Sequence, residues 1–181
     1  MRRGNDVGLR VLAAGLVVGL AACGGNGDPV VRSTPAPTPT PCTQTTLDQG
    51  PVPLNPRTLI YDDFSVPESG RLDITVDWTF AASPIGVYLV PVNTCTLAEF
   101  NSRTCNFLVR SEVTTKPRKI STPNFAAGNY RWIIGNFADV QESASILIVL
   151  SKGECAALTG VPPAAEAAES LPRLEQMNPR R

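Results

Sequence analysis

The sequence predicts an all-β fold, an antiparallel β-sandwich with a jelly-roll-like arrangement of about six to eight short strands. Apolar and polar residues alternate strictly over 71–80, which is the pattern of a strand with one buried face. Turn residues divide the following sequence into short segments, and no long stretch has apolar residues at helical spacing. Many short strands without long helices are typical of a β-sandwich.

The strand at 71–80 places Trp78 and Phe80 at the end of its apolar face, and we expect both in the core. The run 146–150 is apolar on both faces and predicts a central strand. Tyr130, Trp132 and Ile134 share one face of their strand, and we expect this face in the core as well. Further strands are expected at 58–61, 85–92, 107–113, 129–137 and 145–150, with a short edge strand at 117–121.

Three side chains form a candidate ligand surface. Tyr88 lies opposite Val87 and Leu89 on its strand and is therefore expected to be the exposed aromatic residue. Asp73 and Asp77 lie on the polar face of the strand at 71–80. Such residues are usually only solvated, although carboxylates there could bind a sugar or calcium.

The first residues of the chain indicate export. A basic start is followed by an apolar run at 11–22 and then by Cys23, which is the layout of a secretory signal. The run rises only about 18 Å as a helix, against about 30 Å for a hydrocarbon core, so it is too short to span a membrane. An ordinary cysteine of a secreted protein is the other interpretation of Cys23, but the glycine-rich sequence after it is typical of a flexible tether.

The sequence Leu20-Ala21-Ala22-Cys23 resembles the lipobox of bacterial lipoproteins. The resemblance implies that residues 1–22 are a removed signal peptide and that the Cys23 thiol carries a diacylglycerol. It also implies a cell-envelope location on the outer membrane, because Gly24 and not Asp follows the cysteine. The domain would then face the periplasm or the cell surface.

The mature chain is expected to have three parts. Residues 23–41 contain the acylated cysteine and a Gly/Pro/Thr-rich stalk, residues 42–155 form the β-sandwich, and residues 156–181 form a disordered tail. The Pro/Thr run cannot bury a core and favours an extended spacer. The tail is rich in Ala, Glu, Pro and Arg and has no apolar stripe wide enough to dock as a helix.

Four further cysteines predict two disulfides, because exported proteins fold in an oxidising compartment. Four cysteines allow three connectivities, and all three stay open on the number of cysteines alone. We favour Cys95–Cys105, which closes a short polar loop, and Cys42–Cys155, which joins the two ends of the folded region. A zinc site is the alternative, but Cys95 and Cys105 are too far apart in sequence and the chain has no histidine, so no metal is expected.

Three segments resemble the bacterial pre-peptidase C-terminal domain: a Gly-x-Leu strand ending in Trp at 70–78, a Tyr-Leu strand at 86–90 and an Ala-Gly-x-Tyr turn with its strand at 127–134. The resemblance implies a jelly-roll-like module that usually accompanies exported proteases and sometimes binds matrix protein or polysaccharide. This chain departs from the family because no protease is attached. It also lacks the acidic linker that gives some members calcium.

Composition argues against several functions. Positive and negative residues balance and no basic patch occurs, so no nucleic-acid partner is expected. The absence of histidine excludes Ser-His-Asp and Cys-His catalysis. Asp73 and Asp77 lie about 13 Å apart along a strand, beyond the carboxylate spacing of glycoside hydrolases. We therefore expect neither an enzyme nor a cofactor.

The sequence favours a lipid-anchored, non-catalytic β-sandwich that binds an envelope protein or polysaccharide. The alternative is a structural or assembly component of the envelope without a soluble ligand. A carboxylate-dependent hydrolase is a remote second alternative, since carboxylates of different strands could still converge.

Overall fold

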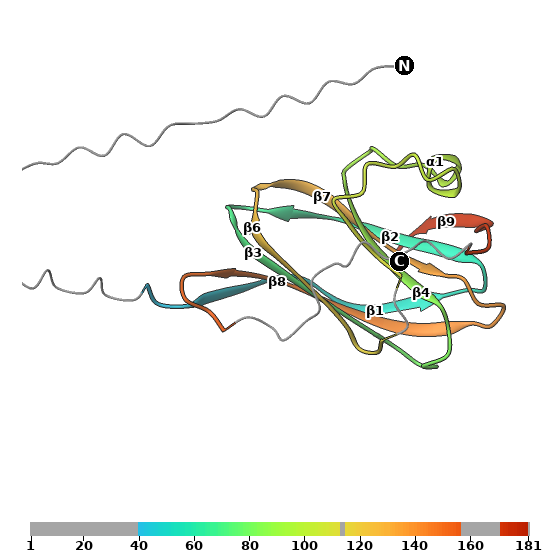
Figure 1. Ribbon diagram of the computed structural model, residues 1–181, viewed down its shortest axis with the longest axis horizontal. Helices are drawn as coiled ribbons and strands as arrows, with labels where there is room; N and C mark the ends of the chain where they lie inside the picture. The colour runs from blue at the N-terminus through green and yellow to red at the C-terminus, as the bar shows by residue number, and fades with distance from the viewer. Residues whose placement is uncertain (1–39, 113–114, 157–170, 181) are drawn as a thin grey trace, which may run out of the picture. The chain divides into compact units, whose positions relative to one another are not determined.

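The computed structural model describes residues 40–112, 115–156 and 171–180. They form two β-sheets packed face to face (Figure 1). The strand order is β1-β8-β3-β6 in the four-stranded sheet, called sheet A, and β5-β4-β7-β2-β9 in the five-stranded sheet, called sheet B. The elements are β1 (Thr43–Leu54), β2 (Thr58–Val66), β3 (Gly70–Trp78), β4 (Ile85–Pro91), α1 (Leu97–Asn101), β5 (Val109–Ser111), β6 (Arg118–Phe125), β7 (Gly128–Asn136), β8 (Glu142–Lys152) and β9 (Gln176–Pro179).

The strand pairing is that of a jelly roll. Antiparallel ladders join β1 to β8, β2 to β7, β3 to β6 and β4 to β5, as in a long ribbon of strand pairs that is folded over on itself. The ladders β3–β8 and β4–β7 complete the two sheets. The predicted all-β, jelly-roll-like sandwich is confirmed. The central position expected for 146–150 is also confirmed, because β8 lies between β1 and β3.

Several strand boundaries differ from the prediction. β1 was not predicted, because half of its residues are polar and it includes Pro51 and Pro53. The strand nevertheless pairs with β8 along its length, and prolines are tolerated because β1 is an edge strand. β2 continues beyond its predicted end to Val66, while β5 is shorter than predicted. The expected edge strand near 117–121 is β6, which is longer than predicted.

The main core lies between the two sheets. Trp132 and Ile134 of β7 are fully buried there, as predicted, and Tyr130 packs at its border. Trp78 is also in this core, but the prediction for Phe80 is wrong, since its side chain is 55% exposed. The reason is that β3 ends at Trp78, so alternation no longer decides where Phe80 points.

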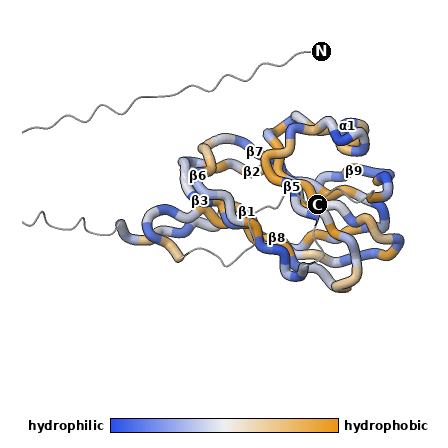
Figure 2. The backbone as a smooth tube through the Cα atoms, in the orientation of Figure 1, coloured by the Kyte–Doolittle hydropathy of each residue, from blue (hydrophilic) through white to orange (hydrophobic). Residues whose placement is uncertain are grey.

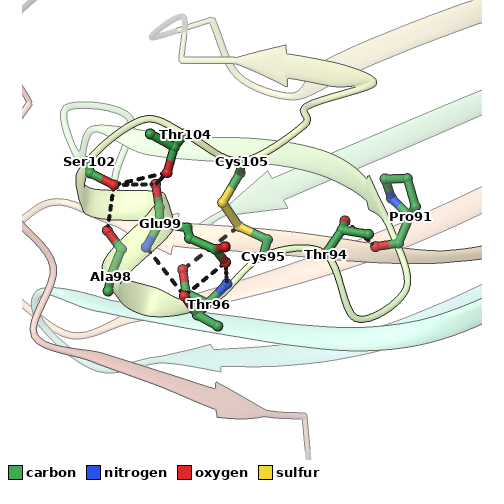
Figure 3. Close-up of a disulfide and its surroundings, with 9 residues drawn as sticks. All are labelled: Pro91, Thr94, Cys95, Thr96, Ala98, Glu99, Ser102, Thr104 and Cys105. Atoms are coloured by element: carbon green, nitrogen blue, oxygen red, sulfur yellow. Dashed lines mark hydrogen bonds between the residues drawn. A yellow bond between two sulfur atoms is a disulfide. The ribbon is translucent and has the colours of Figure 1, made fainter.

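A second apolar cluster covers the outer face of sheet B. Tyr88 and Ile133 of this face pack against Phe100 of α1, Phe107 and Leu174. The short helix begins at a capping box in which Thr96 and Glu99 bond each other's backbone N–H groups (Figure 3). Hydropathy along the backbone is shown in Figure 2. No helix among the described residues is long and apolar enough to cross a membrane.

The structure contains both favoured disulfides, Cys42–Cys155 and Cys95–Cys105. Cys42 precedes β1 and Cys155 follows β8, so this bond joins the ends of two paired strands of sheet A. The Cys95–Cys105 bond closes the loop that carries α1 (Figure 3).

The expected disorder of the tail, residues 156–181, is wrong for residues 171–180, which we call the C-terminal segment. β9 of this segment pairs in parallel with β2, and Leu174 is only 3% exposed. The segment docks through backbone pairing and through apolar side chains, with Leu174 buried and Leu171 and Met177 partly buried against the second cluster, so it needs no amphipathic helix. The predicted signal peptide, Cys23 and nearly all of the stalk lie outside the described residues, as does 157–170.

Candidate binding groove

The outer face of sheet A has an open groove of about 370 Å³, here called the Asp77 groove. Asp77, Ser145 and Pro51 lie side by side in it, because Ser145 of β8 pairs with Asp77 of β3 and with Pro51 of β1. The lining combines one carboxylate and three hydroxyl-bearing side chains with about as much apolar surface. The lining residues are Pro51, Asp77, Trp78, Thr79, Ser143, Ala144 and Ser145.

Asp77 is the charged group of the groove. Its side chain is 52% exposed, and Lys116 Nζ lies 3.5 Å from its Oδ1 atom. The same Oδ1 accepts the Trp78 N–H at 2.9 Å. Among the described residues no hydrogen bond uses Oδ2, so this oxygen is left for a ligand. The prediction that Asp77 is exposed is confirmed.

A buried carboxylate holds one wall of the groove. Glu142 is 2% exposed and accepts the N–H groups of Thr79 at 3.1 Å and Phe80 at 3.2 Å, together with the Ser83 hydroxyl. Thr79 Oγ1 in turn donates to the Ser143 carbonyl at 3.1 Å. These bonds hold residues 79 and 80, which follow the end of β3, in place. The wall of the groove formed by Thr79 therefore has a defined position although it lies outside the strand.

Phe80 follows Thr79 and is the most exposed of the large apolar side chains that are described. Sequence reasoning placed Thr79 on the same polar face as Asp77 but missed Phe80, Pro51, Ser143 and Ser145 as groove residues. The alternation at 142–146 marks the two serines as outward-facing. Nothing local, however, shows that β1 and β3 flank β8 at that point.

The prediction that Asp73 offers a free ligand group is wrong. Its side chain is 2% exposed and accepts hydrogen bonds from Ser121 Oγ at 2.6 Å, Arg71 Nε at 3.0 Å and Ser151 Oγ at 3.3 Å. Arg71 also donates to the carbonyls of Cys155 and Ala156. Asp73 therefore fixes the end of β8 beside the Cys42–Cys155 bond.

The prediction that Tyr88 is exposed is also wrong, since its side chain is 1% exposed. Phe100 and Phe107 cover its ring, with centroids 4.7 and 5.2 Å away, and its hydroxyl donates to Glu112 at 2.6 Å. Burial, and then the negative charge of Glu112, raise the pKa of the Tyr88 hydroxyl well above its usual value. A cavity of only about 40 Å³ remains beside it.

The three residues predicted to form one ligand surface thus lie in three different parts of the structure. Asp77 lies in an open groove, Asp73 within the packing of sheet A and Tyr88 beneath the loop on sheet B. Within the described ranges no three His, Cys, Asp or Glu side chains are grouped so that they could hold a metal ion.

No family model and no curated protein matches the chain. Among solved structures, the chain is similar to the Yersinia pseudotuberculosis-derived mitogen, with 12% sequence identity and a TM-score of 0.41. The similarity covers 69% of this chain and 99% of the mitogen chain. A similarity at this level carries no argument about function.

Proposed function

We propose that this protein is a lipid-anchored, non-catalytic module of the bacterial cell envelope that binds an envelope polysaccharide or protein in the Asp77 groove. The observation that carries the proposal is the groove itself, which is open and lined in part by Asp77 and hydroxyl groups. A groove of this size is within the range of ligand sites in proteins. Its mixed lining of polar groups and apolar surface suits a sugar, which carries hydroxyl groups and an apolar ring face.

Polysaccharide is the favoured ligand class because of the groove's chemistry. Sugar hydroxyls donate to carboxylates and exchange hydrogen bonds with Ser and Thr side chains. Asp77 Oδ2 and Thr79 Oγ1, whose hydrogen is bonded to the Ser143 carbonyl, supply acceptors, and the Ser145 hydroxyl both donates and accepts. The exposed ring of Phe80, next to Thr79, offers an apolar surface for a sugar ring.

The envelope location is supported from two directions. The lipobox-like sequence ends in Cys23 and is followed by a tether. The two disulfides of the folded region are typical of proteins exported to an oxidising compartment. Two acyl chains on Cys23 would anchor the protein stably, since each buried methylene contributes about 0.8 kcal/mol.

Glycan panels and capture from envelope extracts test the groove. Asp77→Asn should weaken capture of the ligand by about tenfold, the size of one lost charged hydrogen bond. Glu68→Gln is the matched control, because its carboxylate is 54% exposed, also faces a lysine and lies before the start of β3 rather than at its end. Equal losses in both variants, or no ligand captured at all, would contradict the proposal, and the second result would favour a purely structural component.

The anchor is tested separately. Cys23→Ser should leave the precursor with its signal uncut and should remove the acyl mass from the N-terminus. Mass spectrometry that finds unmodified Cys23 within a soluble chain cleaved elsewhere would show that the protein is not a lipoprotein.

A further inference from the structure

The C-terminal segment lies in a site built for an extended peptide. Without β9, the edge of β2 in sheet B would present unpaired backbone groups. β9 fills this edge in parallel, and the flanking N–H groups of Glu175 and Arg180 each donate at 2.8 Å, to the carbonyls of Arg57 and Tyr61. Addition of a strand to a sheet edge is a common mode of peptide recognition.

The start of the segment is held by a side chain that acts like a neighbouring strand. Asn101, the last residue of α1, donates from Nδ2 to the Leu174 carbonyl at 2.9 Å. Its Oδ1 accepts the Leu174 N–H at 3.0 Å. One amide side chain therefore satisfies both backbone groups of Leu174. Because these bonds go to the backbone, they do not depend on which side chain the residue at this position carries.

Leu174 is the apolar anchor of the segment. It packs in the second cluster with Leu59 and Phe137. Gly135 leaves room there, because a Cβ at this position would lie 3.0 Å from Leu59, 3.2 Å from Phe137 and 3.4 Å from Leu174. The site thus contains a side-chain pocket as well as a sheet edge.

The end of the segment is held by charge. Arg180 Nη2 lies 2.6 Å from Asp48 Oδ1 of β1 and 2.9 Å from Asp62 Oδ2 of β2, so one guanidinium joins the two sheets. Its Cζ lies 5.1 Å from the centroid of the Trp132 ring, and Asp48 also accepts the Trp132 Nε1–H at 2.6 Å. A pair of half-buried carboxylates beside an aromatic ring is a specific site for arginine.

We propose that this edge is a peptide-recognition site, that the C-terminal segment occupies it in cis, and that a partner protein displaces the segment with an extended peptide carrying an apolar residue and, toward its C-terminal end, an arginine. The site is separate from the Asp77 groove and does not depend on lipidation. The chemistry of the partner follows from the groups that the segment now occupies, namely the Leu174 pocket and the Asp48–Asp62 pair.

The C-terminal segment does not satisfy every polar group in the site, so another peptide could bind it more tightly. Arg180 Nη1 is buried and has no hydrogen-bond partner within the described part of the chain. An unsatisfied buried donor weakens binding of the segment, so a ligand that satisfies or lacks this donor would bind more tightly. A segment in the same chain as its site has an effective concentration on the order of millimolar, so a partner must bind more tightly than the segment to replace it.

Exchange with a labelled peptide tests the proposal. A specific protease site placed between Gly160 and Val161 of the full chain allows the segment to be cut free after folding and removed by gel filtration. A fluorescein-labelled peptide of residues 171–181 should then bind the cut protein at least about tenfold more tightly than it binds the intact protein, whose site is occupied in cis. The affinity is read by fluorescence anisotropy.

Substitutions of single carboxylates test whether the labelled peptide binds at the Asp48–Asp62 pair. Asp62→Asn should weaken binding of the peptide by about tenfold through loss of the charged contact, and a peptide with Arg180→Ala should bind equally weakly. The neighbouring Asp63→Asn is the matched control, since its carboxylate also pairs with an arginine, Arg131, and has a similar exposure of 44% against 39% for Asp62. This control should change the affinity by less than about twofold.

Three results would overturn the inference. A scrambled peptide that binds as well as the native sequence would show that no specific site exists. Unfolding of the cut protein after loss of the segment, followed by circular dichroism, would make β9 an integral strand and not a ligand. Dimers of the intact chain that exchange segments between copies would assign the site to a second copy in place of a partner protein. Neither lipid nor glycan enters the experiment, so its failure is distinct from failure of the proposed function.

Discussion

The outward faces of the two sheets differ both in the side chains they carry and in their exposure to solvent. On β8 of sheet A burial alternates from Glu142 to Leu150, and the outward residues Ser143, Ser145 and Leu147 are exposed. On β4 of sheet B every residue from Ile85 to Val90 is buried. The difference arises because the loop closed by Cys95–Cys105 and the C-terminal segment cover sheet B. Alternation therefore shows which side chains share a face of the sheet, but not whether other parts of the chain bury that face from solvent.

The largest expected effect concerns the disulfide of each sheet. Removing Cys42–Cys155 with a pair of Cys→Ala changes should lower the free energy of unfolding by about 5 kcal/mol, against about 3 kcal/mol for Cys95–Cys105, in the chain-entropy model. The bonds close segments with sequence separations of 113 and 10 residues. Chemical denaturation of the two double variants measures the order. The reverse order would mean that the loop covering sheet B matters more than the loop-length difference.

The next prediction tests whether the outer face of sheet B is buried as firmly as a hydrophobic core. Tyr88→Ala should lower the free energy of unfolding by about 3–5 kcal/mol, as for a buried aromatic side chain. The reason is the loss of contacts with Phe100 and Phe107. Equilibrium unfolding in urea measures it. A change below about 1 kcal/mol would mean that the loop does not cover this face in solution.

A pH series sharpens the same comparison. The folded protein raises the pKa of Tyr88, so the hydroxyl stays protonated in the folded state while it ionises in the unfolded state above about pH 10. Stability is therefore fully present below pH 10 and falls above it, by up to about 1.4 kcal/mol per pH unit from this group. Tyr88→Phe should fall less steeply over this range. Parallel profiles of the two proteins would contradict the assigned burial.

The smallest effect is expected on the open face of sheet A. Leu147→Ser should change the free energy of unfolding by no more than about 0.5 kcal/mol, because its side chain is already exposed. The adjacent Ile148→Ala should cost about 2–5 kcal/mol, since Ile148 is fully buried between the sheets. Thermal or urea unfolding of these two variants measures how much the outer and the inner face of β8 each contribute to stability. A large loss for Leu147→Ser would indicate that something covers sheet A as well.

Much of the fold was predictable from local sequence. The alternation in β3, the apolar run of β8 and the four cysteines of the folded region predicted a sandwich, a central strand and the two disulfide pairs that the structure contains. The exposure of Asp77 was predicted for the same reason. These features depend on the two-residue period of a strand and on the positions of cysteines at the ends of the folded region, and both can be counted along the chain.

The surroundings of the candidate site residues were decided by tertiary structure alone. Asp73 is buried because Ser121 and Ser151 reach it from the strands on either side, and Tyr88 is buried because a distant loop folds over it. Docking of Leu174 and Arg180 depends on a pocket and a carboxylate pair assembled from β1, β2 and β7. The period of a strand is a local property of the backbone, so the sequence indicates which side chains share a face. The residues that cover the second face come from distant parts of the chain, so only the folded protein shows whether that face is buried.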